Sequence, residues 1–182
     1  MTKFVPDPSG VQAIADALRF SSISLTVTDM RYNNLDMESA TMLANIAKEK
    51  RISLCGITPG QTEADFTPSS KHNYERMGPA DAILLTADLA SLTNLNLGRN
   101  SLKDEGVKVV CEALQSKVGT KLKSLNVAFN GVGPVGAKAV AAMAAVVASL
   151  TKLDIQYNWL GEEGEAVLRK AVEGRSGFEL VL

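Results

Sequence analysis

LTNLNLGRNSL (residues 92–102), LKSLNVAFNGV (122–132) and LTKLDIQYNWL (150–160) share one pattern, LxxLxLxxNxL. A weaker copy, LTVTDMRYNNL, covers residues 25–35. The apolar spacing is too irregular for one amphipathic helix and too long for one strand. Copies that recur at steps of about 30 residues are instead typical of a solenoid, in which each unit forms one turn of a coil.

Each copy is followed by a stretch with helical periodicity. The stretches are GVKVVCEALQ, GAKAVAAMAAVV, GEAVLRKAV and, after the weaker copy, SATMLANIA, and GVQAIADALR near the N-terminus is a helix without a strand before it. Within each copy, the alternating apolar pair predicts a short strand with polar neighbours facing outward. Because one unit cannot bury its own apolar side, stacked units are predicted to share a core between a parallel sheet and the helices.

The interval between the first two copies leaves room for one longer unit. RISLCGI supplies strand positions at Ile52 and Leu54, and MGPADAILLTADL supplies the helix. The segment between them, about residues 58–76, breaks the repeat spacing and is predicted to be an irregular insertion. Either it contacts a ligand beside the sheet or it is a simple surface excursion.

The chain resembles the leucine-rich repeat proteins of the ribonuclease-inhibitor-like type. The resemblance implies an α/β fold, namely a right-handed α/β solenoid or horseshoe with short parallel strands on the concave face and helices on the convex face. We expect a single domain over residues 1–182, with about five repeats plus a terminal strand formed by GFELVL. In this family, turn asparagines form a structural ladder, which here implies Asn33, Asn100, Asn130 and Asn158.

The amino-acid composition limits the classes of partner that the protein is predicted to bind. Lys and Arg total 19 against 20 for Asp and Glu, so no strong field draws the protein to nucleic acid or to an anionic membrane. The most apolar stretch, residues 139–150, is shorter than the roughly 18 residues of a membrane span. Cys55 and Cys111 lack CxxC spacing, which argues against disulfides and zinc and predicts a reducing, cytoplasmic location.

Three motifs suggest chemistry, but each has a simpler interpretation. GVGPVG (131–136) matches GxGxxG, but the polar residues interleaved in the preceding strand do not fit a sheet covered on both faces. Glu162, Glu163 and Glu165 crowd a helix start, where the helix dipole favours negative charge. His72 is the only histidine and lies in a polar stretch. We therefore predict no cofactor, no metal site and no enzymatic activity.

Outward-facing residues of the repeats predict a surface that binds another protein. Tyr, Trp and Arg are the residue types that dominate interface energies most often. The predicted partner-binding residues on the concave face are Asn96, Arg99, Asn126, Phe129, Asp154, Tyr157 and Trp159. The alternative, that the aromatic side chains only pack against adjacent turns, stays open.

The predicted function is a non-enzymatic protein–protein interaction module. The resemblance leaves one alternative, a regulator of a GTPase or of another enzyme, acting as an activator or as an inhibitor. A strand edge at the C-terminus also predicts self-association, by edge-strand pairing or by stacking of units.

Overall fold

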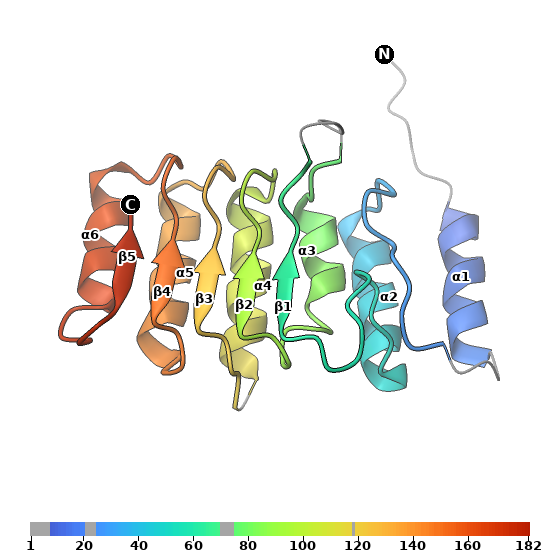
Figure 1. Cartoon of the computed structure of the whole chain (residues 1–182). Helices are drawn as coiled ribbons and strands as arrows, with labels where there is room; N and C mark the ends of the chain where they lie inside the picture. Colours follow the sequence, from blue (N-terminus) through green and yellow to red (C-terminus); the bar gives the residue numbers. More distant parts are fainter. Residues whose placement is uncertain (1–7, 21–24, 70–74, 118) are drawn as a thin grey trace, which may run out of the picture.

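The computed structural model describes residues 8–20, 25–69, 75–117 and 119–182. Helices and strands alternate along the chain in the order α1 (Pro8–Phe20), α2 (Met37–Lys50), β1 (Glu63–Asp65), α3 (Pro79–Leu85), β2 (Asn94–Asn96), α4 (Lys103–Ser116), β3 (Ser124–Asn126), α5 (Pro134–Val146), β4 (Lys152–Asp154), α6 (Gly161–Ala171) and β5 (Glu179–Val181). The five strands pair in parallel, in chain order. Figure 1 shows them in one row with the helices behind. The predicted α/β solenoid is confirmed.

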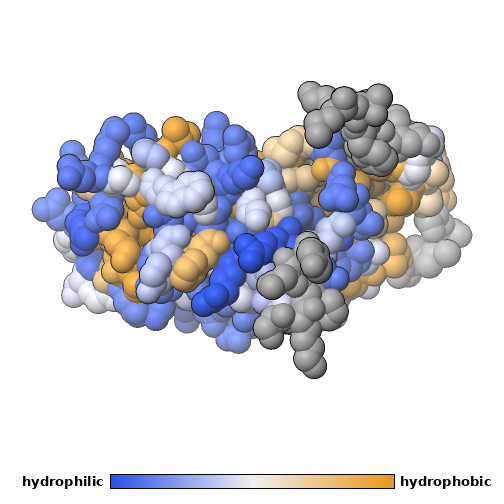
Figure 2. Space-filling model, turned by 90° about the horizontal axis from the view of Figure 1, so that it is seen from above, coloured by the Kyte–Doolittle hydropathy of each residue, from blue (hydrophilic) through white to orange (hydrophobic). Residues whose placement is uncertain are grey.

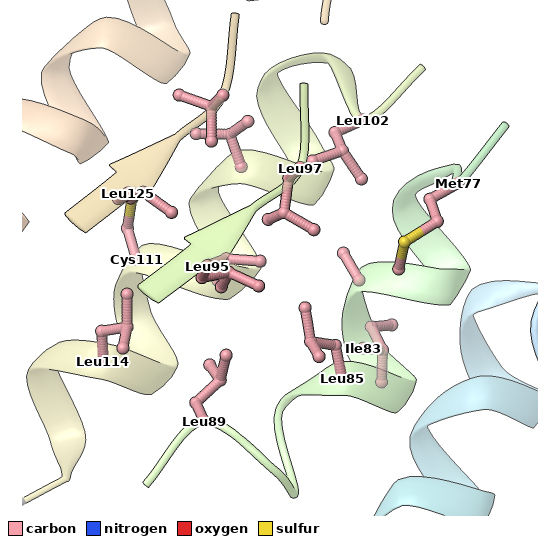
Figure 3. Close-up of a cluster of buried hydrophobic side chains, with 14 of the residues drawn as sticks. Met77, Ile83, Leu85, Leu89, Leu95, Leu97, Leu102, Cys111, Leu114 and Leu125 are labelled. Atoms are coloured by element: carbon pink, nitrogen blue, oxygen red, sulfur yellow. The ribbon is translucent and has the colours of Figure 1, made fainter. Parts of the chain in front are cut away.

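The apolar positions of the repeat form a continuous core. Leu95, Leu125 and Leu153 pair with one another across the sheet and are buried. Figure 3 shows Leu95 of β2, and Leu97 just after that strand, facing Cys111 and Leu114 of α4. Each buried leucine contributes roughly 1.5–3 kcal/mol of hydrophobic stabilisation. Stacking of units therefore supplies the core that no single unit has.

Glycines set how closely neighbouring helices approach. A Cβ atom on Gly136 would lie 2.6 Å from Asp104 Oδ1 and 2.6 Å from Val132 Cγ1. Gly106 and Gly164, at the same place in their repeats, are less crowded, with the closest atoms at 3.1 Å. The small residue that follows each copy of the pattern therefore permits close helix packing.

The longer unit before residue 80 differs from the prediction. Ile52 and Leu54 are buried and Ser53 bridges Val27, but no helix follows them directly. The strand that precedes α3 is β1, which lies inside the segment predicted to be an irregular insertion. Its Ala64 pairs with Leu95 of β2, so β1 occupies a regular strand position of the repeat.

β1 could not be recognised from the repeat pattern, because its unit keeps few of the residues that define the pattern. The register with β2 places Ala64 at a leucine position and Ser69 at the asparagine position. Phe66, at the second apolar position, is buried as the pattern requires. The alternation of Ala64 and Phe66, one repeat step before Leu95, was the signal that could have located the strand.

Candidate functional site

The backbone turns sharply after each strand of the repeat. The last residue of β2 accepts a hydrogen bond on its own side chain, from Gly98 N to Asn96 Oδ1 at 3.0 Å. Side-chain oxygens of aspartate and asparagine stabilise such turns by accepting the amide two residues on. The same bond recurs at Asp29, Asp65, Asn126 and Asp154. Three residues predicted to bind a partner, Asn96, Asn126 and Asp154, therefore hold turns.

The turn then passes through a left-handed residue. Its φ is 64° at Tyr32, 61° at Arg99, 54° at Phe129 and 54° at Tyr157. This conformation is unfavourable for residues other than glycine. The surrounding hydrogen bonds must therefore hold these four side chains in place.

The ladder asparagines complete the turns from inside. Nδ2 of Asn130 donates to the carbonyls of Leu97, Val127 and Ala128, while its Oδ1 accepts from Leu102 N. Asn100 and Asn158 likewise bond to their own turn and to a neighbouring one. Asn33 is exposed and donates only within its own turn, to the carbonyls of Met30 and Arg31.

Three of the predicted binding residues stack along the turns. The rings of Phe129 and Tyr157 are 4.2 Å apart between centroids and 16° from parallel. The guanidinium carbon of Arg99 lies 4.8 Å from the Phe129 centroid, within the range of a cation–π contact. The stack crosses three consecutive repeats at the edge where the strands end. Figure 2 shows the molecule from above, with hydrophilic and hydrophobic residues side by side on this face.

The outer end of this stack is exposed. Trp159 is 78% exposed, Tyr157 67% and Phe129 39%. We call Arg99, Phe129, Tyr157 and Trp159 the turn patch. It borders a hollow of about 560 Å³, whose other lining residues are Thr67, Pro68, Arg76 and Gly131. The volume lies within the range of about 300–1,000 Å³ that is common for ligand sites.

The far wall of the hollow comes from the segment predicted to be irregular. Thr67, Pro68 and Arg76 follow β1 in that segment. Because β1 restores the repeat register, the residues after it face the turns of the next units. Contact of this segment with a ligand was one of two alternatives predicted from sequence, but these residues were not identified.

The strand face itself forms another, smaller hollow. It measures about 390 Å³ and is lined by residues of β1 to β4. Several of these side chains already have partners. Lys152 pairs with Glu179 at 2.7 Å, and Asn94 Nδ2 donates to Glu63 Oε1 at 2.7 Å.

The glycines of GVGPVG belong to a helix start that is capped from the neighbouring repeat. Asp104 Oδ1 accepts from Gly133 N at 2.6 Å and from Gly136 N at 3.0 Å. A dinucleotide phosphate would need amides at this kind of helix start. Here a carboxylate of α4 takes that position.

Several other titratable residues are buried in the core or form ion pairs within the fold. Burial raises the pKa of Asp88 to about 6, although Ser53 Oγ donates to its carboxylate at 3.0 Å. Cys55 and Cys111 are free and buried, and burial raises the pKa of both thiols. At the start of α6, Glu163 pairs with Lys138 at 2.8 Å and Glu165 with Arg169 at 3.4 Å. His72 lies outside the described residues.

The described part of the chain holds neither a metal cluster nor a membrane-spanning helix. Nowhere in it do three or more His, Cys, Asp or Glu side chains come together as metal ligands could. None of its helices has the length and apolar character needed to cross a bilayer.

The repeats also match known proteins. The leucine-rich repeat family matches residues 89–111, 120–141 and 148–164, the region of the three strong copies. The protein is a leucine-rich repeat protein. Its helix-containing units are consistent with the ribonuclease-inhibitor-like type. Repeats of this family support a general role in protein interaction.

This leucine-rich repeat protein is similar to one curated protein and to two solved structures. A mouse protein, NACHT, LRR and PYD domains-containing protein 12, is 37% identical over 78 residues, which are 43% of this chain and 7% of that protein's length. The tropomodulin C-terminal domain of Caenorhabditis elegans has a TM-score of 0.44 at 16% identity, covering 90% of this chain and 91% of the domain. Leiomodin-1 Actin-Binding Site 2 has a TM-score of 0.45 at 11% identity, covering 97% and 80%.

Proposed function

We propose that this leucine-rich repeat protein is a non-enzymatic module that binds another protein through the turn patch. Asn96, Asn126 and Asp154, which hold the turns and line the strand-face hollow, contribute through the side-chain atoms that the turns leave free. The observation that carries the proposal is the exposed stack of Arg99, Phe129 and Tyr157 beside a 560 Å³ hollow.

The exposure of the turn-patch side chains favours binding of a partner over simple packing within the protein. An aromatic side chain that only packed against its neighbours would bury most of its surface, whereas Tyr157 and Trp159 leave most of theirs open. Exposed tyrosine, tryptophan and arginine are the residue types found at the centres of protein interfaces. A partner would therefore gain a large contact area on side chains that the turns already hold rigid.

The test is a binding comparison between three forms of the protein. Wild type, Tyr157→Ala/Trp159→Ala and the control Val135→Ala/Val146→Ala are used to capture partners from extract. The control residues are 63% and 65% exposed and lie on α5, and neither of them lines the hollow. For a partner that the control retains, we expect replacement of Tyr157 and of Trp159 to weaken the free energy of binding by about 2 kcal/mol each. Each loss corresponds to roughly 30-fold in affinity.

The packing alternative gives the opposite result. If Tyr157 and Trp159 only stabilise the turns, the double variant melts at a lower temperature and keeps its partner. The further alternative, regulation of a GTPase or of another enzyme, stays a prediction. It would need the captured partner to be such an enzyme and its turnover to change on binding.

A further inference from the structure

The hollow beside the turn patch carries two arginines without carboxylate partners. The ion pairs of the described residues include neither Arg76 nor Arg99, and both side chains are exposed. Arg31, in an earlier turn, is different. It pairs with Asp29 and its side chain is only 18% exposed. Arg31 therefore has a structural role, whereas Arg76 and Arg99 keep their charge available.

The two hollows differ in the charge of the residues that line them. None of the described residues that line the turn-patch hollow is acidic. The strand-face hollow contains Glu63, Asp65 and Asp154 against a single lysine. An acidic group would therefore be attracted to the arginine side and repelled by the strand face, which fixes the direction in which a charged ligand could lie.

The lining of the turn-patch hollow next to Arg99 is aromatic. Tyr157 stacks on Phe129 with one ring face and is 67% exposed overall. The indole of Trp159 packs near Gly131. A Cβ atom added to this glycine would lie 3.8 Å from the indole. Proline and aromatic side chains bind well to such flat, rigid surfaces.

We propose that the occupant of this hollow is an extended segment of a protein partner in which Asp or Glu lies close to a proline or an aromatic residue. The carboxylate binds between Arg76 and Arg99, and the apolar residue packs on Tyr157 and Trp159. This inference rests on the proposed function and adds the chemistry of the partner to it.

A single-stranded nucleic acid would use similar residue types, but the surroundings disfavour it. Tyr157 and Trp159 leave ring surface open for a base as well as for a proline or an aromatic side chain, so charge decides between the two classes of partner. A run of phosphates would extend past the arginines toward Asp65 and Asp154. The chain has a net charge of −1, so no wider positive field offsets that repulsion.

The experiment is a selection from a display library of short random peptides. Wild type is the bait, and peptides that also bind Tyr157→Ala/Trp159→Ala are removed. The selected peptides are synthesised and their affinities are measured against wild type, Arg76→Gln/Arg99→Gln and Arg76→Glu/Arg99→Glu. Melting curves confirm that each variant is folded. A fluorescent single-stranded oligouridine is measured in parallel.

We expect the selected peptides to carry Asp or Glu near Pro, Phe, Tyr or Trp. Affinity should fall about tenfold or more with the glutamine pair and further with the glutamate pair. Replacing the acidic residue of the peptide by its amide should abolish the difference between wild type and the glutamine pair.

Three results would overturn the inference. Selected peptides that are basic or uncharged, yet depend on Tyr157 and Trp159, refute the acidic partner and leave the proposed function standing. Oligouridine binding that is lost in the aromatic variant replaces the protein partner by nucleic acid. Selection of no peptide that depends on the aromatic residues counts against both the inference and the proposed function.

Discussion

Replacing Asn130 by alanine tests the structural basis of the turns. Asn130 is 2% exposed, and its side chain bonds to four backbone groups in two repeats. Three of these groups keep a second partner in the variant. Leu97 O still accepts from Asn100, Val127 O from Asn158, and Ala128 O from Arg99 N. Leu102 N loses the only hydrogen bond found for it in the described structure.

The expected cost follows from those partners. A buried amide left without an acceptor costs about 1–3 kcal/mol, and each weakened carbonyl bond adds a net 0.5 kcal/mol or so. The sum is about 3 kcal/mol for Asn130→Ala. Asn33→Ala is the matched control, because Asn33 occupies the same place in an exposed turn and makes two local bonds only. Its expected cost is about 0.5 kcal/mol.

The assay is urea unfolding of both variants, followed by circular dichroism. Hydrogen exchange of the amides in residues 97–102 and 127–132 shows whether the loss is local, since solenoids can open one repeat at a time. Equal destabilisation by Asn130→Ala and Asn33→Ala would refute the reasoning. So would protection of Leu102 N that is unchanged in the Asn130 variant.

Three further changes have defined outcomes. Gly136→Ala should destabilise by about 1–2 kcal/mol in thermal unfolding even after the gain in helix propensity, whereas the less crowded Gly164→Ala should be near neutral. Asp88 has its pKa raised from 3.8 to about 6 on folding, so stability should fall as pH rises from about 4 to 6; Asp88→Asn should remove that slope from the pH dependence of Tm, and an identical slope would contradict it. Tyr157→Gly should change the free energy of unfolding by less than about 1 kcal/mol, because relief of the left-handed conformation offsets the lost ring stack. The same variant should lose partner binding.

The sequence predicted the parts of the fold that repeat. LxxLxLxxNxL states which residues face the core, and the strands β2, β3 and β4 fall inside its three strong copies. The helices could be predicted because their periodicity follows each copy after a small residue. The turn residues Arg99, Phe129 and Tyr157 shared one column of the pattern, so their proximity could also be foreseen.

The sequence could not predict contacts between units that depart from the pattern. β1 was missed because Ala64 and Ser69 replace a leucine and an asparagine, which left the alternation of Ala64 and Phe66 as a weak signal. Arg76 and Pro68 were missed with it. The turn-holding role of Asn96, Asn126 and Asp154 also stayed hidden, because an outward polar residue in a strand looks the same whether it binds a partner or its own backbone.

The turn geometry supports the proposal that a partner binds at this edge of the sheet. A side-chain oxygen holds each turn from one side and an asparagine amide holds it from inside, so the left-handed residue between them is fixed whatever its side chain. Glycine would occupy that position with the least strain. Four repeats instead carry Tyr32, Arg99, Phe129 and Tyr157, each at a cost of about 1–2 kcal/mol. In the later repeats the ring stack and the cation–π contact recover only part of this cost, since the outer side chains remain exposed. Stability alone therefore does not explain large side chains at these positions, whereas the proposed contact with a partner would.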